Sequence, residues 1–272
     1  MNYSAKIQDA YQYLKTKTNL SPKIGIVLGS GLGDLANVVE NPINIAFSEI
    51  PHFPVSTVEG HDGKLIFGTL EGKPVLLLKG RVHYYEGYSM QELTFPIRIM
   101  QAFGVEILIL SNACGGLSSD LKVGELALIK DHINLVGENP LRGENDEKLG
   151  PRFPDLSKAY DPQLIEIAEK VGNAQQIKLT KRIYAIVSGP TYETEAEANY
   201  LRIIGADIVG MSTVPECIVA NHAGIKVLGI SCVTDISPPF GTEEITHEAV
   251  VEIALKVQPI FIKLVRNIVK EL

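Results

Sequence analysis

A glycine and serine turn at the end of an apolar run is the first feature of this chain that could do chemistry. Residues 24–33 read Ile-Gly-Ile-Val-Leu-Gly-Ser-Gly-Leu-Gly. Such a turn points several backbone N–H groups at one place, and that geometry suits an anion. The pattern stops one residue short of the dinucleotide motif G-x-G-x-x-G because position 34 is Asp. It therefore favours a lone phosphate over a dinucleotide.

Arg81 and His83 follow another apolar run and supply cationic donors. They are two residues apart, and in extended chain this spacing sends both side chains to the same side. Together they could hold an oxyanion through charge-assisted hydrogen bonds. The alternative is an Arg paired with a surface carboxylate and a His that caps a loop.

Small residues fill the segment 111–116, which reads Ser-Asn-Ala-Cys-Gly-Gly and follows an apolar run. Ligands of α/β sheets bind at such strand ends, and small side chains let the backbone approach them closely. Cys114 could be a catalytic thiol or a buried, inert one. No charged residue lies within several positions of it, which favours the inert thiol because nothing nearby in sequence lowers its pKa.

Two other chemistries lose support. Residues 210–213 read Gly-Met-Ser-Thr, but position 214 is Val, so the serine-hydrolase elbow G-x-S-x-G is incomplete. The six histidines show no H-x-x-x-H pair and no grouping with carboxylates at ligand spacing. The sequence therefore predicts no protein-bound metal. Catalysis is expected to depend on positioning and hydrogen bonds.

Alternating strands and helices must position these turns. Apolar runs predict strands at 65–70, 75–79, 107–110 and 227–233, the first two as a hairpin around Glu71-Gly72. Helical spacing predicts helices around 3–16, 91–103, 162–171, 195–204 and 215–223, and a last helix capped by Thr246. The fold class is α/β, a single domain with a central mixed sheet flanked by helices.

Composition bounds the class of protein. The chain has 272 residues, 45% of them hydrophobic, which is enough for a large core in one domain over 1–272. A net charge of −7 argues against a nucleic-acid partner. The three cysteines, in a chain without an N-terminal apolar signal region, indicate a reducing cytoplasm. No stretch approaches the ~18 apolar residues of a membrane span.

Two further segments stand out between the predicted elements. Residues 139–162 are polar, with Phe153 and Tyr160 as their aromatics, and a loop of this length in a compact domain is usually functional or mobile. Residues 189–194 lead into a predicted helix, which makes Thr194 a plausible cap and Glu193 a plausible first-turn acid.

Taken together, these turns form a series that resembles the trimeric purine nucleoside phosphorylases nearly from end to end. The series consists of residues 29–33, 81–85, 111–116, 189–194 and 210–213, with Thr234-Asp235 and Thr246-His247 behind them. The resemblance implies a sheet that is partly barrel-like. It also implies reversible phosphorolysis of purine ribo- and deoxyribonucleosides, inosine and guanosine above all, in purine salvage. The products are the free base and (deoxy)ribose 1-phosphate, formed through an oxocarbenium-like state.

The resemblance also assigns site residues. Phosphate is expected at Ser30, His61, Arg81, His83, Ala113 and Ser212. The nucleoside is expected at Tyr85, Phe153, Tyr192, Glu193, Val209, Met211, Asp235 and His247. Catalytic roles fall to His83, Glu193 and Asp235. Hydroxyls, cationic groups and backbone N–H groups suit a dianion without a metal, so inorganic phosphate is the expected co-substrate and no cofactor is expected.

Three of these assignments carry the specificity that the resemblance implies. Glu193 would accept hydrogen bonds from N1–H and the exocyclic amine of guanine. His247 would meet the 5′-hydroxyl. Phe153 would reach the ribose in a neighbouring subunit of a homotrimer.

Asp235 departs from the pattern of the family. Members restricted to 6-oxopurines commonly have Asn there, whereas the related methylthioadenosine phosphorylases have Asp. Those relatives lack an acid at the position of Glu193 and have an apolar residue at the position of His247, so these two residues favour inosine and guanosine. A methylthioadenosine or methylthioinosine phosphorylase is the alternative enzyme. A nucleotide-sensing binding protein is the alternative from a different class.

Overall fold

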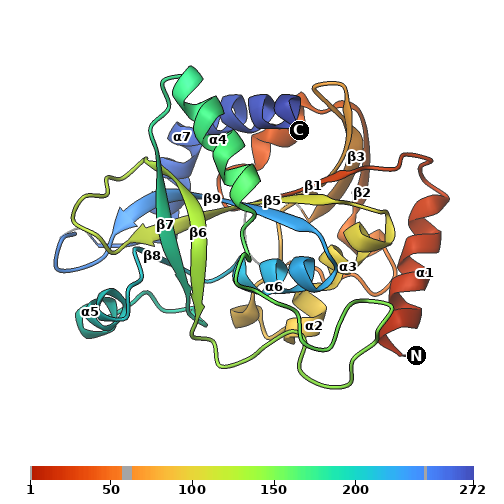
Figure 1. Ribbon diagram of the computed structural model, residues 1–272, viewed down its shortest axis with the longest axis horizontal. Coiled ribbons are helices and arrows are strands. Elements are labelled where there is room, and N and C mark those ends of the chain that lie inside the picture. Colours follow the sequence, from red (N-terminus) through yellow and green to blue (C-terminus); the bar gives the residue numbers. More distant parts are fainter. Residues whose placement is uncertain (1, 57–62, 242–243) are drawn as a thin grey trace.

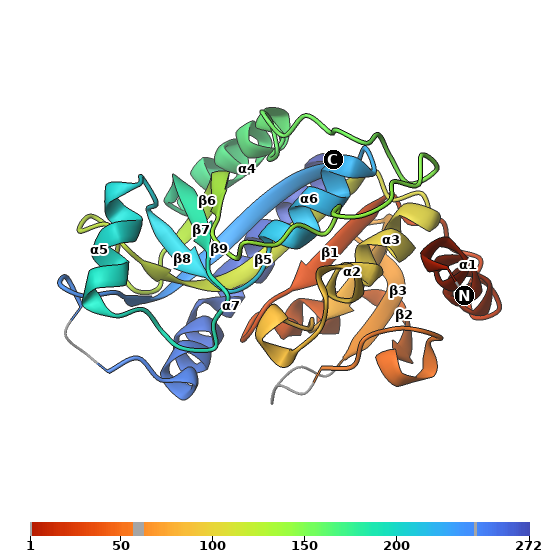
Figure 2. The ribbon, with the colours of Figure 1, turned by 90° about the horizontal axis from the view of Figure 1, so that it is seen from below.

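A mixed sheet runs through the whole molecule, and the described residues contribute nine strands to it (Figures 1 and 2). The structure is a computed structural model that describes residues 2–56, 63–241 and 244–272. The strands are β1 (Ile24–Leu28), β2 (Glu40–Ala46), β3 (Lys64–Leu70), β4 (Lys73–Lys79), β5 (Ile107–Gly116), β6 (Leu126–Asn134), β7 (Leu179–Ile186), β8 (Ile208–Gly210) and β9 (Lys226–Ile236).

Part of this sheet closes into a ring. The strand order is β2-β3-β4-β1-β5-β8-β7-β6-β9, and an additional pairing joins β5 to β9. The five strands from β5 to β9 in this order therefore form a closed, barrel-like unit, while β2, β3, β4 and β1 extend from it as an open sheet. This confirms the expected α/β class with a mixed, partly barrel-like sheet.

Local sequence explains the open part of the sheet. Strands β3 and β4 pair antiparallel with Leu70 opposite Lys73. Glu71 and Gly72 between them have φ values of 50° and 77°, and two such residues make the tight turn that a two-residue hairpin requires. The predicted hairpin is confirmed.

The parallel strands of the sheet determine where the turns of interest meet. Strand β1 pairs parallel with β4 and β5, and β5 pairs parallel with β9. All five residues of β1 are buried, as expected for a strand covered on both faces. The carboxyl ends of β1, β4, β5 and β9 therefore lie at the same edge of the sheet.

Helices cover the sheet and its ends. They are α1 (Tyr3–Lys15), α2 (Met90–Leu93), α3 (Phe95–Ala102), α4 (Pro162–Ala174), α5 (Glu195–Ile203), α6 (Val214–His222) and α7 (His247–Glu271), with 3₁₀ turns η1 (Gly33–Val38), η2 (Phe47–Glu49) and η3 (Tyr84–Glu86). Helix α3 contacts α6, and α4 contacts α7. Helices α1 and α5 lie at opposite ends of the molecule (Figure 2).

The structure corrects the sequence predictions at two helices, the one expected at 91–103 and α5. The single helix expected at 91–103 is two helices that meet at Thr94, because Pro96 has no N–H with which to continue the α2 pattern. Thr194 caps α5 as expected, its hydroxyl accepting from the Glu197 N–H at 3.2 Å. Glu193, however, precedes this cap, so the prediction that it is a first-turn acid is wrong.

The last helix behaves as its sequence pattern predicts. The hydroxyl of Thr246 accepts from the Ala249 N–H at 3.2 Å and so begins α7. The buried face of α7 includes Val250, Ala254, Val257, Phe261, Leu264 and Ile268. No helix in the described part of the chain is long and apolar enough to cross a membrane.

Candidate active site

A cleft of about 340 Å³ opens at the edge of the sheet where the parallel strands end. It is lined by Gly29, Ser30, Arg81, His83, Tyr85, Asn112, Ala113, Cys114, Gly115, Pro190, Tyr192, Glu193, Val209, Gly210, Met211, Ser212, Thr234, Asp235, His247 and Val250. Each segment singled out as part of the family series contributes to this lining. The expectation that 111–116 is a turn after the strand is wrong, because the strand β5 continues through Gly116. Residues separated by more than 200 positions thus meet because the strands that carry them run parallel.

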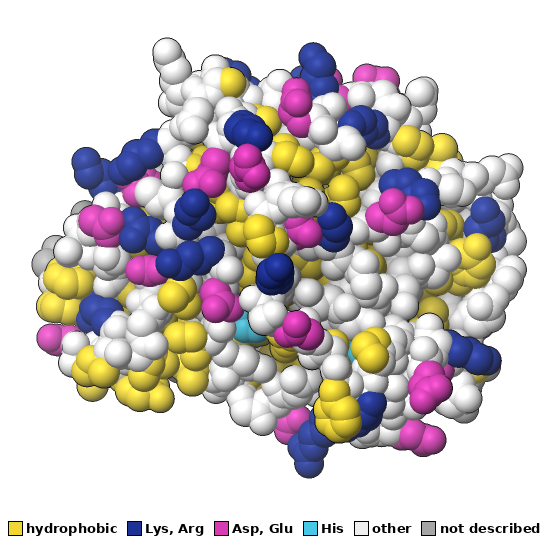
Figure 3. All heavy atoms as spheres, in the orientation of Figure 1, with side chains coloured by type: hydrophobic (Ala, Val, Ile, Leu, Met, Phe, Trp, Pro, Cys, Tyr) yellow, Lys and Arg dark blue, Asp and Glu magenta, His cyan; other side chains and the backbone are white. Residues whose placement is uncertain are grey.

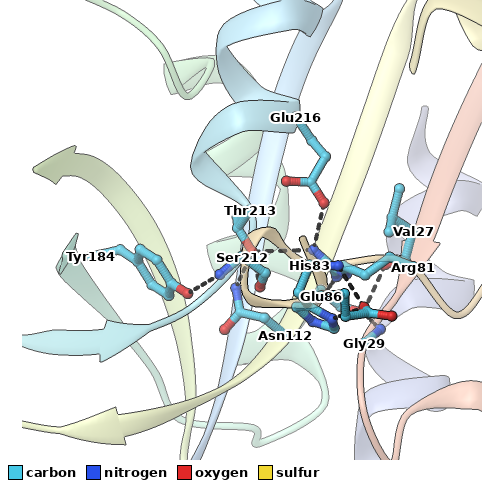
Figure 4. A network of polar contacts seen from close by, with 11 residues as sticks. Val27, Gly29, Arg81, His83, Glu86, Asn112, Tyr184, Ser212, Thr213 and Glu216 are labelled. Atoms are coloured by element: carbon cyan, nitrogen blue, oxygen red, sulfur yellow. Dashed lines mark hydrogen bonds and ion pairs between the residues drawn. The ribbon is translucent and has the colours of Figure 1, made fainter. Parts of the chain in front are cut away.

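Arg81 is held in place by buried partners. It is 5% exposed, and its Nη1 donates to Glu216 Oε1 at 2.9 Å and to Thr213 Oγ1 at 3.4 Å (Figure 4). Its Nη2 donates to the carbonyl of Ser111. Glu216 is itself buried, so this is an internal ion pair and not the surface pair that the alternative predicted. The charge of Arg81 is therefore balanced within the protein at the cleft wall.

His83 also has a carboxylate partner. Its Nδ1 lies 3.2 Å from Glu86 Oε1, and the same oxygen accepts the His83 backbone N–H at 2.7 Å. The 3₁₀ turn η3 creates this contact because it brings residues three apart to the same side. A carboxylate only accepts, so Nδ1 carries a proton. The imidazole stacks on the ring of Tyr85, with centroids 4.8 Å apart and planes at 9°.

Ser212 is positioned by the strand end of β8 and the start of α6. Its N–H donates to the hydroxyl of Tyr184 at 3.4 Å, and its Oγ lies 3.1 Å from Thr213 Oγ1. Tyr184 fits there because Gly210 has no side chain, and a Cβ at Gly210 would lie 2.2 Å from the Tyr184 oxygen. The hydroxyl of Ser212 thus lies at the cleft beside the buried network of Arg81 (Figure 4).

Two carboxyl groups occupy the other side of the cleft. Burial raises the pKa of Glu193, and the nearby carboxyl of Asp235 raises it further. Burial also raises the pKa of Asp235, although a hydrogen bond from Thr234 Oγ1 at 3.0 Å opposes this. Both groups therefore hold their protons to a higher pH than an exposed carboxyl does.

Gly115 makes room for Asp235. A Cβ at this glycine would lie 2.9 Å from Asp235 Oδ2 and 3.3 Å from both Ser237 Oγ and Val209 Cγ1. The small residues in the second half of β5 therefore serve to admit side chains from β8 and β9. Cys114 next to it is 3% exposed, and burial raises the pKa of its thiol well above the usual range. The structure thus supports the inert thiol and not the catalytic one.

Comparisons with known proteins decide the family. The model of the Phosphorylase superfamily matches residues 23–270. The chain is 51% identical over 266 residues to Purine nucleoside phosphorylase 1 of Bacillus subtilis (strain 168), covering 98% of each chain. The chain belongs to the purine nucleoside phosphorylase family. Its similarity to named enzymes over nearly its full length removes support from the nucleotide-sensor alternative.

Solved structures of this family share the fold closely. The purine nucleoside phosphorylase of Schistosoma mansoni in complex with adenosine superposes with a TM-score of 0.94 at 40% identity, covering 98% of this chain and 97% of that one. A Schistosoma mansoni purine nucleoside phosphorylase in complex with inosine gives a TM-score of 0.94 at 39% identity, with 98% and 96% covered. Similar structures therefore include one with a 6-aminopurine nucleoside and one with a 6-oxopurine nucleoside.

Most of the residues that the resemblance to this family implied lie in the one cleft. They are Ser30, Arg81, His83, Tyr85, Ala113, Tyr192, Glu193, Val209, Met211, Ser212, Asp235 and His247. Phe153 is not among the residues that line it, and it is 88% exposed on the loop before α4. His61 lies outside the described residues.

Sequence reasoning missed the residues that hold Arg81 and His83 in place at the cleft. Glu216 reads as an ordinary first-turn acid of a helix that begins with a proline, and nothing in its spacing connects it to Arg81. Thr213 and Asn112 belong to the segments 210–213 and 111–116, but the local pattern assigned neither residue a role of its own. Glu86 could have been found, because it lies three positions after His83 in a short polar turn.

Proposed function

We propose that the cleft binds inorganic phosphate on its Arg81 side and a 6-oxopurine nucleoside on its Glu193 side. The observation that carries this proposal is the arrangement itself, in which oxyanion donors and two carboxyls with raised pKa values share one cavity of about 340 Å³. The donors are Arg81, His83 and the hydroxyl of Ser212. Phosphate and a nucleoside held side by side react as if within one molecule, which lowers the barrier.

In the proposed reaction, a phosphate oxygen attacks the anomeric carbon of the ribose as the bond to the purine nitrogen breaks. The sugar passes through an oxocarbenium-like state and becomes ribose 1-phosphate, while the bonding electrons leave with the purine. A proton delivered at N7 neutralises the departing base. The phosphate thus serves as nucleophile and as the negative charge that stabilises the developing cation.

Glu193 and Asp235 are proposed to recognise and protonate the base. An ionised Glu193 would accept the hydrogen bond from N1–H of a 6-oxopurine. A neutral Asp235 would donate to O6 or N7, both of which are acceptors that an ionised acid repels. Burial raises the pKa of both carboxyls, so a neutral Asp235 fits its surroundings. Glu193 is assigned the ionised form because N1–H needs an acceptor. Asp235 would then act as the general acid.

The Asp at position 235 favours a second candidate substrate. An ionised Asp235 could accept a hydrogen bond from a 6-amino group, as in adenosine or methylthioadenosine. His247 lines the cleft and is proposed to meet the 5′-hydroxyl, and a polar residue in that role favours an ordinary nucleoside over a methylthio one. We therefore place inosine and guanosine first and 6-aminopurine nucleosides second.

The remaining expectations concern the oligomer and the other residues of the site. We propose a homotrimer in which Phe153 of one subunit reaches the ribose in the next, because this aromatic ring is 88% exposed in its own chain. His61 is proposed as a cover for the phosphate. Tyr85, Met211 and His247 are proposed at the ribose, with Tyr192 and Val209 on either side of the purine. A cytoplasmic location and a reaction without a cofactor stay predictions.

The test is turnover of inosine, guanosine, adenosine and methylthioadenosine with and without phosphate. Release of hypoxanthine from inosine should require phosphate and yield ribose 1-phosphate. Equal rates in phosphate-free buffer would contradict phosphorolysis. Faster cleavage of adenosine than of inosine would overturn the substrate assignment and leave the reaction type intact. Light scattering checks the trimer, and a monomer would contradict it.

A further inference from the structure

Thr213 has a backbone conformation that threonine rarely adopts. Its φ is 75° and its ψ is −48°, and the Val214 N–H donates to the Ser212 carbonyl at 2.8 Å. This is a three-residue γ-turn of the rare, strained kind. Positive φ is especially unfavourable for a β-branched residue. Strain of this kind concentrates at functional sites, where the surrounding structure holds it in place.

The turn places the buried hydroxyl of Thr213 at the centre of a polar network. Thr213 is fully buried. Its Oγ1 receives hydrogen bonds from Asn112 Nδ2 at 2.9 Å and Arg81 Nη1 at 3.4 Å, and it lies 3.1 Å from Ser212 Oγ (Figure 4). All three neighbours, Arg81, Asn112 and Ser212, line the cleft. Arg81 and Ser212 are the two proposed to contact phosphate.

Counting donors and acceptors fixes the direction of each proton. A guanidinium only donates, and the amide nitrogen of Asn112 only donates, so both lone pairs of the Thr213 oxygen are used. Of the three atoms that contact Thr213 Oγ1, only Ser212 Oγ can accept the proton of Thr213. Because Ser212 accepts this bond, its own proton points elsewhere, and the serine borders the cleft.

We propose that Thr213 is a positioning residue that turns the hydroxyl proton of Ser212 toward the bound phosphate. Without this bond nothing fixes the torsion of the serine hydroxyl, which could then rotate and present a lone pair instead of its proton to the anion. The strained turn has a function in this arrangement, because it holds Thr213 Oγ1 between Arg81, Asn112 and Ser212. The proposal rests on the proposed function, since it requires phosphate as the ligand of Ser212.

Substitution of the hydroxyl tests the proposal. Thr213→Val keeps the β-branch and nearly the same shape but removes the hydroxyl, whereas Thr213→Ser keeps the hydroxyl. With saturating inosine, we expect Thr213→Val to raise the phosphate KM about tenfold or more, and Thr213→Ser to stay within about threefold of wild type. The inosine KM at saturating phosphate should change by less than about twofold in both variants.

A double-mutant cycle separates this role from a merely structural one. In a Ser212→Ala background, Thr213→Val should raise the phosphate KM by a clearly smaller factor, because the proton it directs is gone. An equal factor in both backgrounds would overturn the proposal. Should Thr213→Val melt too low to assay, Thr213→Ala also lacks the hydroxyl and is less strained at positive φ, and the same results are expected of it.

The wild-type enzyme distinguishes the two ways of failing. If wild type cleaves inosine equally fast without phosphate, the proposed function is wrong. If wild type needs phosphate but Thr213→Val keeps the phosphate KM within twofold, the proposed function stands and the role of Thr213 is wrong.

Discussion

The two sides of the cleft are built differently. On the phosphate side, Arg81 and His83 are 5% and 9% exposed, and each has a carboxylate partner inside the protein. On the base side, Tyr192 is 38% exposed, and Glu193 comes from the loop that precedes α5. The side chains on the Arg81 side are held by buried partners before any ligand binds. The Glu193 side consists of loop residues and the two carboxyl groups.

This difference indicates how substitutions on each side of the cleft should affect activity. Donors fixed by a buried network lose little freedom when an anion binds, so substitutions there should affect every substrate. A carboxyl on the base side reads one edge of one base, so its replacement should change the substrate more than the reaction. On the face of the molecule drawn in Figure 3, basic and acidic side chains are interspersed.

Removal of Arg81 should have the largest effect. We expect Arg81→Ala to lower kcat/KM for phosphate by two orders of magnitude or more, about 3 kcal/mol, because a charge-assisted contact is lost. It also leaves Glu216 as an uncompensated buried charge, so the melting temperature should fall. Assays belong below the melting temperature of the variant. Arg142→Ala, at an exposed ion pair, is the control. An unchanged kcat/KM for phosphate in Arg81→Ala would show that Arg81 does not bind phosphate.

Removal of Glu193 should test the base side with the next largest effect. In Glu193→Ala the N1–H of inosine has no acceptor, which should cost ~2 kcal/mol or more, about 30-fold in kcat/KM. The phosphate KM should change little. Glu195→Ala, two positions on in the first turn of α5, is the matched control. Equal, small losses in both variants would mean that Glu193 serves only the helix.

Phe153→Ala should have a moderate effect that extends the comparison to a neighbouring subunit. Loss of an apolar contact to the ribose should raise the inosine KM about tenfold, roughly 1.4 kcal/mol, and affect free hypoxanthine less. Ile203→Ala, at an exposed apolar residue of α5, is the control. Identical losses for nucleoside and base would argue for a general defect and against a ribose contact.

Asp235→Asn should have the smallest effect on inosine at neutral pH. The amide donates to O6 or N7 without a proton from solvent, so we expect inosine turnover within about threefold of wild type or better. The fall in rate toward high pH should be weaker than in wild type, and any activity on adenosine should be lost. A steep fall at high pH in the variant would show that a different group titrates.

Stability provides a second measurement on Asp235. Its pKa is raised in the folded chain, so the folded chain binds this proton more tightly than the unfolded chain does. That contribution to the free energy of unfolding is present below the unfolded pKa and is lost as pH rises through the raised pKa. Asp235→Asn has no proton to lose at this position, so its melting temperature should decline less with pH than that of wild type.

The phosphate side was also the easier side to anticipate from sequence. Glycine-rich and small-residue turns after apolar runs predicted Ser30 and Ala113 near one edge of a sheet, and the two-residue spacing of Arg81 and His83 predicted a shared side. The structure places all four at the cleft. For Glu193 the alternative of a first-turn acid is wrong, because it precedes the Thr194 cap, and the spacing around a helix start does not show on which side of the cap a residue lies.

The sequence by itself indicated the β3–β4 hairpin, the helix caps and most helices, since hairpin turns, caps and apolar periodicity act over a few residues. It did not indicate strands β2, β6, β7 and β8. Through resemblance it also indicated the family. Only the tertiary structure decided that Glu216 pairs with Arg81, 135 residues away, and that Thr213 lies between Arg81, Asn112 and Ser212. Such contacts depend on strand register and on a strained turn. No local pattern encodes them, because the pairing energy arises only when parallel strands bring their ends together.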